Sequence, residues 1–141
     1  MVEIVNRQRQ RKLNAKHWRE FGARALDAIG KDQKTATIVF VSDGAIQALN
    51  RRFRGKNQST DVLSFPSAVE RFEIETAAQL GDVIISVPRA LAQAKENGLS
   101  FADEVSQLIL HGLLHLCGYD HETDQGEMNR HELRLRKKLG I

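Results

Sequence analysis

Three histidines lie close together in the segment HGLLHLCGYDH, near the end of the sequence. His111 and His115 are four positions apart, so on a helix both side chains lie on one face, about a turn apart. Gly118 tolerates the positive φ at which a helix can end sharply, and the following turn can bring His121 beside them. Three neutral imidazoles and an open position are typical of catalytic zinc. The spacing therefore predicts one zinc ion, or a related divalent ion, on these three histidines.

The single cysteine and the other two histidines do not extend the cluster. A structural zinc site usually has four protein ligands, often cysteines, but Cys117 is the only cysteine. It lies two residues after His115 and so points away from the histidine face of the helix. We expect Cys117 to be a buried thiol near the metal and not a nucleophile. His17 and His131 are expected to be ordinary helix residues.

The spacing H-x-x-x-H-x-x-G-x-x-H is also the ligand frame of the metzincin proteases. Those enzymes have a glutamate directly after the first histidine as general base, where this chain has Gly112. Glycine cannot accept a proton, so a peptidase mechanism loses its base while the Lewis-acid metal remains. The pattern indicates a hydrolytic site with a different substrate or with a base supplied elsewhere. A metzincin-like peptidase or amidase remains an alternative.

A second set of candidate residues lies in the basic N-terminal half. Residues 1–60 hold 13 Lys and Arg against 5 Asp and Glu, whereas residues 61–141 hold 8 against 13. This asymmetry suits a polyanionic partner, although the same charges could simply cover a solvated surface. The guanidinium of Arg54 is a planar fork that fits phosphate oxygens, but a charge near a helix end also favours the helix dipole. The candidate contacts to such a polyanion are Arg51, Arg52, Arg54 and Lys56.

Strands interleaved with helices must position these residues. Strands are predicted at residues 2–5, 36–41, 61–65 and 81–87, and helices at residues 15–29, from Ser42 or Asp43 onward, 88–97, about 100–118, and 124–138. The pattern predicts an α+β fold, with a mixed four-stranded sheet, about five helices and the zinc site at the end of a helix-turn segment. The order of the strands is not readable, and residues 67–80 show no clear pattern.

Composition narrows the class of protein further. No apolar stretch approaches the roughly 20 residues of a membrane span. The first residues, MVEIVNRQRQRK, lack the apolar core of a secretory signal, and a single cysteine excludes an internal disulfide framework. We therefore expect a cytoplasmic protein whose residues 1–141 form a single domain. The sequence does not indicate an oligomeric state.

The histidine segment closely resembles the signature of the YbeY family, bacterial metal-dependent endoribonucleases associated with ribosomal RNA maturation. Two further segments resemble the family: residues 49–66, which contain LNRRFRGK and TDVLSFP, and LGDVIIS at residues 80–86. The resemblance runs from about Thr37 to the C-terminus. It implies zinc on the three histidines and an essential arginine at Arg54. The family usually has an acidic residue after the position of Lys56, where this chain has Asn57, so we assign that position no catalytic role.

The leading hypothesis is a zinc-dependent endoribonuclease that cuts single-stranded RNA, in ribosomal RNA maturation and ribosome quality control, on pre-ribosomes or defective ribosomes. A non-enzymatic ribosome-binding protein with a structural metal fits the charge asymmetry equally well, but not the incomplete ligand set. Three aspartates are further candidates. Asp61 either orients a histidine or holds a turn, Asp120 could also orient a histidine, and we favour a turn role for Asp82.

Overall fold

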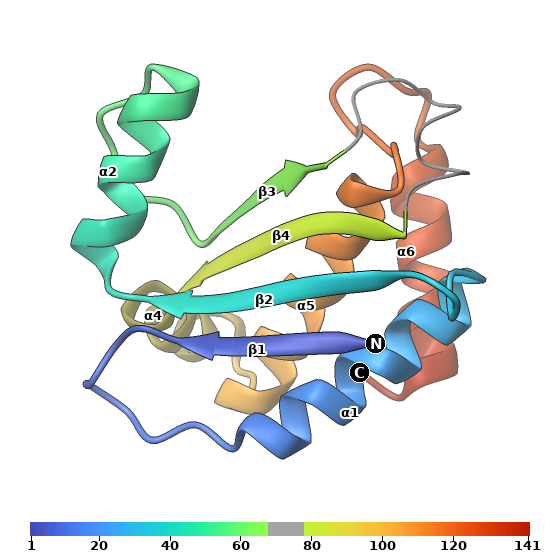
Figure 1. Ribbon diagram of the computed structural model, residues 1–141, viewed down its shortest axis with the longest axis horizontal. Coiled ribbons are helices and arrows are strands. Elements are labelled where there is room, and N and C mark those ends of the chain that lie inside the picture. Colours follow the sequence, from blue (N-terminus) through green and yellow to red (C-terminus); the bar gives the residue numbers. More distant parts are fainter. Residues whose placement is uncertain (68–77) are drawn as a thin grey trace.

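The computed structural model describes residues 1–67 and 78–141, so most of the segment without a clear pattern lies outside the described residues. The elements are β1 (Val2–Asn6), α1 (Ala15–Ile29), β2 (Thr35–Val41), α2 (Asp43–Arg54), β3 (Val62–Pro66), β4 (Gln79–Ser86), α4 (Val87–Asn97), α5 (Phe101–Leu116) and α6 (Glu127–Leu139). The described residues thus form one four-stranded sheet and five helices, which confirms the predicted α+β fold (Figure 1). No helix among them is long and apolar enough to cross a membrane.

The sheet has the strand order β1-β2-β4-β3. β1 pairs in parallel with β2, and β2 pairs in parallel with β4. β3 pairs with β4 in the antiparallel direction, so the sheet is mixed, as expected. This order places β3 at one edge of the sheet, where α5 also contacts it.

The two faces of the sheet are covered differently. Ile38 and Phe40 of β2 belong to the main core, which they share with apolar residues of α1, α4 and α5. Val41 instead packs with Ile46 of α2 in a smaller cluster. The alternation of side chains along a strand explains this division between neighbouring residues. In Figure 1, α2 lies at the far end of the sheet from α6, and α4 is the helix that it contacts there.

The close pairing of β3 and β4 depends on a glycine. Gly81 has a φ of 140°, and a Cβ at this position would lie 2.3 Å from the carbonyl oxygen of Phe65. The register between β2 and β4 shifts in the same region. Glycine is therefore required at this position for the two strands to approach each other.

The helix bounds follow the predicted caps, with one correction. Ser42 caps α2, which resolves the alternative of Ser42 or Asp43. The last helix was expected from residue 124 but begins at Glu127. The reason is that Gly126 has a φ of 93°, while the Asp124 carboxylate accepts hydrogen bonds from the backbone N–H groups of Gly126 and Met128, at 2.9 Å each. Asp124 is thus part of the turn that precedes the helix and not of the helix itself.

Candidate metal centre

Two of the three histidines lie on α5, which packs against the sheet. The glycine between them explains how close this packing is. A Cβ on Gly112 would lie 2.6 Å from Cγ1 of Val83, and the Gly112 carbonyl accepts a hydrogen bond of 3.2 Å from the Ser64 hydroxyl. Glycine therefore occupies the position after His111 because the helix meets the sheet there. A glutamate, as in the metzincin frame, would collide with the sheet.

The third histidine lies on the exposed turn that follows α5. Gly118 has a φ of 95°, so the chain leaves the helix in the left-handed conformation expected from the sequence. The carboxylate of Asp120 accepts a hydrogen bond of 3.0 Å from the backbone N–H of Glu122, and its carbonyl accepts another from Asp124 at 3.1 Å. Asp120 thus holds the turn that presents His121.

The structure brings the three predicted ligands together. One ring nitrogen from each of His111, His115 and His121 lies within 4.8 Å of the other two, so the cluster could hold one metal ion. The ring centroids are 4.7 to 5.5 Å apart. His111 and His115 are partly buried, whereas His121 is exposed.

The chemistry of these nitrogens fits a metal site. The Nε2 atoms of His111 and His115 are 3.1 Å apart. Two nitrogens bound to one tetrahedral zinc, each about 2.0–2.1 Å from it, would be about 3.3 Å apart. Burial lowers the pKa of His115, and the neighbouring His111 lowers it further. Both effects favour the neutral ring, which is the form that binds metals.

Glu132 of α6 is a site residue that our reading of the sequence did not identify. Its Oε1 lies 2.8 Å from Nδ1 of His111, and its Oε2 lies 3.5 Å from Nη2 of Arg136. Burial acts to raise the pKa of Glu132, but the hydrogen bond from His111 and the charges of His111 and Arg136 outweigh it and lower the pKa. A sequence signal was available: Glu132 lies on the same stripe of α6 as the buried Met128 and Leu135.

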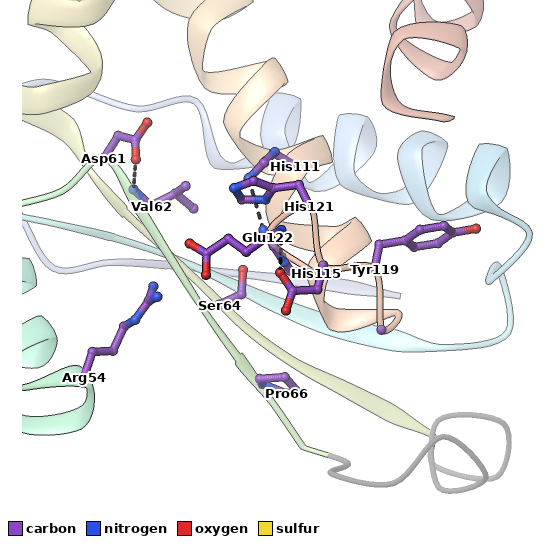
Figure 2. A pocket seen from close by; sticks show the side chains of 12 residues that line it. Arg54, Asp61, Val62, Ser64, Pro66, His111, His115, Tyr119, His121 and Glu122 are labelled. Carbon is purple, nitrogen blue, oxygen red and sulfur yellow. Dashed lines mark hydrogen bonds between the residues drawn. The ribbon is translucent and has the colours of Figure 1, made fainter. Parts of the chain in front are cut away.

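The histidines open onto a cavity of about 560 Å³ between α5 and the end of α2 (Figure 2). It is lined by Arg54, Asp61, Val62, Ser64, Pro66, His111, His115, Gly118, Tyr119, Asp120, His121 and Glu122. Arg54 is the last residue of α2, and in Figure 2 its side chain points toward β3 from the side opposite the histidines. The structure thus brings Arg54 and the histidine cluster to one cavity, although they are far apart in the sequence.

The other predicted RNA contacts lie outside this cavity. Arg51, Arg52 and Lys56 are exposed, and none of them lines it. The guanidinium carbon of Arg52 lies 5.2 Å from the ring centre of Phe53, and Arg52 lines a separate cavity together with Asp82. The four basic residues therefore do not form one continuous cavity wall.

Of the remaining candidates, Asp61 does line the cavity, and its Oδ1 accepts a hydrogen bond of 2.8 Å from the backbone N–H of Val62. This contact is that of a residue that holds a turn. Cys117 is half-buried against the main core. His17 contacts Trp18 edge-on and His131 stacks on Tyr119, and neither histidine belongs to the ligand cluster.

The chain is similar to known proteins over almost its whole length. Residues 3–140 match the family model described as Endoribonuclease YbeY. The chain is 38% identical over 141 residues to the Endoribonuclease YbeY of Geobacter metallireducens, which covers 99% of this chain and 94% of that protein. It is 45% identical over 108 residues to the protein of the same name from Nautilia profundicola, covering 77% of this chain and 74% of that protein.

A solved structure is similar as well. The solution structure of a Thermotoga maritima protein matches with a TM-score of 0.67 and 25% sequence identity. The match covers 99% of this chain and 89% of the other. The likeness thus extends over the sheet and the helices that carry the candidate site.

Proposed function

This chain belongs to the YbeY family and is an endoribonuclease, and we propose that it cuts single-stranded RNA at a metal ion held by His111, His115 and His121. The resemblance seen in the sequence is confirmed by the family match over residues 3–140. The proposal includes one zinc ion per chain and a single catalytic domain comprising residues 1–141. It also includes ribosomal RNA as substrate, on pre-ribosomes or defective ribosomes, and a cytoplasmic location.

One observation supports the catalytic part of the proposal above the others: Arg54 and the three histidines line one cavity. A zinc ion bound to the histidines would supply a Lewis acid for a phosphate oxygen or a bound water. Arg54 would bind the non-bridging oxygens of the scissile phosphate and stabilise the negative charge that increases on them in the transition state. Its guanidinium has no hydrogen-bond or ion-pair partner in residues 1–67 and 78–141, so it is available to a ligand.

The formal charges in the cavity support a metal-dependent mechanism. Arg54 contributes one positive charge to the lining, and three carboxylates contribute negative charge: Asp61, Asp120 and Glu122. Without a cation, a phosphate entering the cavity would meet net negative charge, which repels it. A divalent ion on the histidines offsets this repulsion. We therefore expect RNA binding at the cavity, as well as cleavage, to depend on the metal.

The position of Gly112 disfavours the peptidase alternative. The metzincin base would have to stand where the helix touches Val83. The residue directly after His111 is Gly112, which has no side chain that could act as a base. The family match agrees with an enzyme that acts on RNA.

The test is single-turnover cleavage of a labelled single-stranded RNA by the purified protein. The protein is assayed as purified, after removal of metal with a chelator, and after reloading with zinc. We expect activity to be lost with the metal and restored by zinc, while a matched duplex RNA and an unstructured peptide remain uncut. Cleavage that persists in metal-free protein, confirmed by elemental analysis, would contradict the metal-dependent mechanism.

A further inference from the structure

We infer that Glu132 is a positioning residue for the metal centre: it holds the imidazole of His111 as the Nδ1–H tautomer and thereby presents Nε2 to the ion. This inference rests on the metal-binding part of the proposed function. It assigns a role to α6, which contributes no histidine to the cluster.

The contact between Glu132 and His111 determines which ring nitrogen of His111 carries the proton. Oε1 of Glu132 lies 2.8 Å from Nδ1 of His111. An ionised carboxylate only accepts hydrogen bonds, so Nδ1 must carry the proton. In the neutral imidazole Nε2 then keeps its lone pair, and Nε2 is the atom that lies 3.1 Å from Nε2 of His115. The carboxylate thus fixes both the tautomer and the direction of the ring.

The Glu132 carboxylate is poorly explained by stability alone. Its side chain is 8% exposed, and a buried charge destabilises a fold unless it is well paired. Its contact with Arg136 is long, at 3.5 Å, and the Arg136 Nε is buried without a hydrogen-bond partner among the described residues. The shortest contact of Glu132 is therefore with the histidine and not with the arginine. Replacing a buried ion pair with apolar residues is often neutral for stability. Replacing Glu132 and Arg136 in this way would, however, remove the hydrogen-bond partner of the His111 ring.

His111 and His115, the two ligands on α5, are held from different parts of the chain. For His115, the backbone of Tyr119 in the following turn acts to raise the pKa of the ring, against the larger effect of burial. His111 obtains its partner from a different helix, 21 residues further along the chain. The orientation of His111 therefore depends on the docking of α6, and a side-chain substitution can remove its partner.

The experiment measures zinc affinity of the metal-free protein by competition with a chromophoric chelator. Carboxylates that orient a metal-bound histidine typically contribute about 10–100-fold in metal affinity. We expect Glu132→Gln, which keeps an acceptor but removes the charge, to weaken zinc binding about tenfold, and Glu132→Leu to approach the upper end of that range. Thermal unfolding of the metal-free variants checks that the fold is retained.

Glu104 provides the matched control, because it is an equally buried acid whose partner is an amide. Counted over the whole residue, Glu104 is 4% exposed and Glu132 is 6% exposed. Oε1 of Glu104 accepts a hydrogen bond of 2.7 Å from Nδ2 of Asn97. Glu104→Gln should leave the zinc affinity within about twofold of the parent, since it does not touch a ligand. The inference is overturned if Glu132→Gln binds zinc as tightly as the parent, or if Glu104→Gln loses as much affinity.

A second measurement does not depend on the variants folding. The ¹⁵N chemical shifts of the His111 ring in the metal-free parent report which nitrogen carries the proton. We expect a protonated Nδ1 and an unprotonated Nε2 in the neutral ring, and the opposite tautomer would overturn the inference. If the parent binds no zinc at all, the proposed metal function fails. If the parent binds zinc and Glu132→Gln binds it equally well, only the role of Glu132 fails.

Discussion

The two sides of the cavity are built in different ways. The histidine side is α5, which buries ten of its 16 residues. The arginine side is the end of α2, which buries only two of its 12 residues, and whose Phe53 is 58% exposed. A metal site needs fixed nitrogen positions, whereas a flexible polymer substrate can be met by an exposed side chain. The comparison suggests that metal geometry is set by the core and that phosphate recognition is set at the surface.

Hydrogen bonding differs between the two sides in the same way. His111 is hydrogen-bonded to Glu132. Arg54 has no such partner within the described part of the chain. Substitutions on the two sides should therefore separate metal binding from phosphate recognition.

The largest effect is expected from removing the histidine side. The double substitution His111→Ala and His115→Ala should abolish most zinc binding, because one ligand alone remains. RNA cleavage should fall on the order of a thousand-fold or more, since a Lewis-acid metal supplies several kcal/mol of transition-state stabilisation. Elemental analysis and single-turnover cleavage measure the two effects. Full zinc occupancy in this variant would show that the ion is held elsewhere.

Removing the arginine side should decrease the cleavage rate without loss of metal. Arg54→Ala should reduce single-turnover cleavage on the order of a hundred-fold or more, as is typical when one preorganised donor to the transition state is lost. Arg54→Lys should recover little, because an ammonium group lacks the planar fork of donors. Zinc content and the unfolding temperature should stay at the parent values, because α2 is exposed at this end. An Arg54→Ala enzyme that cuts RNA at the parent rate would exclude the proposed role.

A glycine-to-alanine substitution in α5 and another in α2 compare how tightly the two helices are packed. Gly112→Ala forces a Cβ against Val83 and should lower the free energy of unfolding by about 1–3 kcal/mol. Gly44→Ala in α2 has open space around the new Cβ and should raise it by about 0.5–1 kcal/mol, because alanine favours the helix. Urea unfolding of the metal-free proteins measures both values. Equal effects at the two glycines would mean that α5 is not packed more tightly than α2.

Much of the fold could be predicted because its signals are local. The cap and the glycine at the ends of α1 and α4 lie within a few residues of the helices they delimit. The strand order could not be predicted, because it depends on which distant segments pair. Placing β4 between β2 and β3 requires pairings across the sequence that no local pattern encodes. The predicted start of α6 was wrong for a local reason. The Asp124 carboxylate accepts hydrogen bonds from the backbone N–H groups of Gly126 and Met128, so Asp124 lies in the turn before the helix.

The candidate site also depends partly on local sequence signals and partly on contacts between distant segments. The histidine cluster could be predicted because one helix and one turn contain all three residues. Local reasoning alone left Arg54 ambiguous, because its place in the cavity depends on how α2 lies relative to β3; the family resemblance indicated its importance. Glu132 was missed because its contact depends on the packing of α6 against α5. A carboxylate on the apolar stripe of an amphipathic helix is the signal to look for.

The smallest effects are expected from Arg51 and Arg52, which precede Arg54 in α2 but do not line the cavity. Arg51→Ala should weaken RNA binding a few-fold at low salt and leave the single-turnover rate at saturating RNA unchanged. Each phosphate contact to a single strand contributes about 0.7 to the slope of log affinity against log salt concentration. The variant should therefore show a shallower slope by about that amount. Fluorescence anisotropy with a labelled RNA across a salt series measures this slope.

Arg52→Ala should have a smaller effect still and serves as the control for Arg51→Ala. The Arg52 guanidinium lies over Phe53, and the residue lines the separate cavity with Asp82 and not the cavity of the histidines. Either substitution could instead reduce the rate at saturating RNA as strongly as Arg54→Ala. The end of α2 would then act as one catalytic unit, and the distinct role proposed for Arg54 would be wrong. If neither changes the salt dependence, these two arginines do not contact the RNA backbone, and Arg54 is the contact that α2 provides.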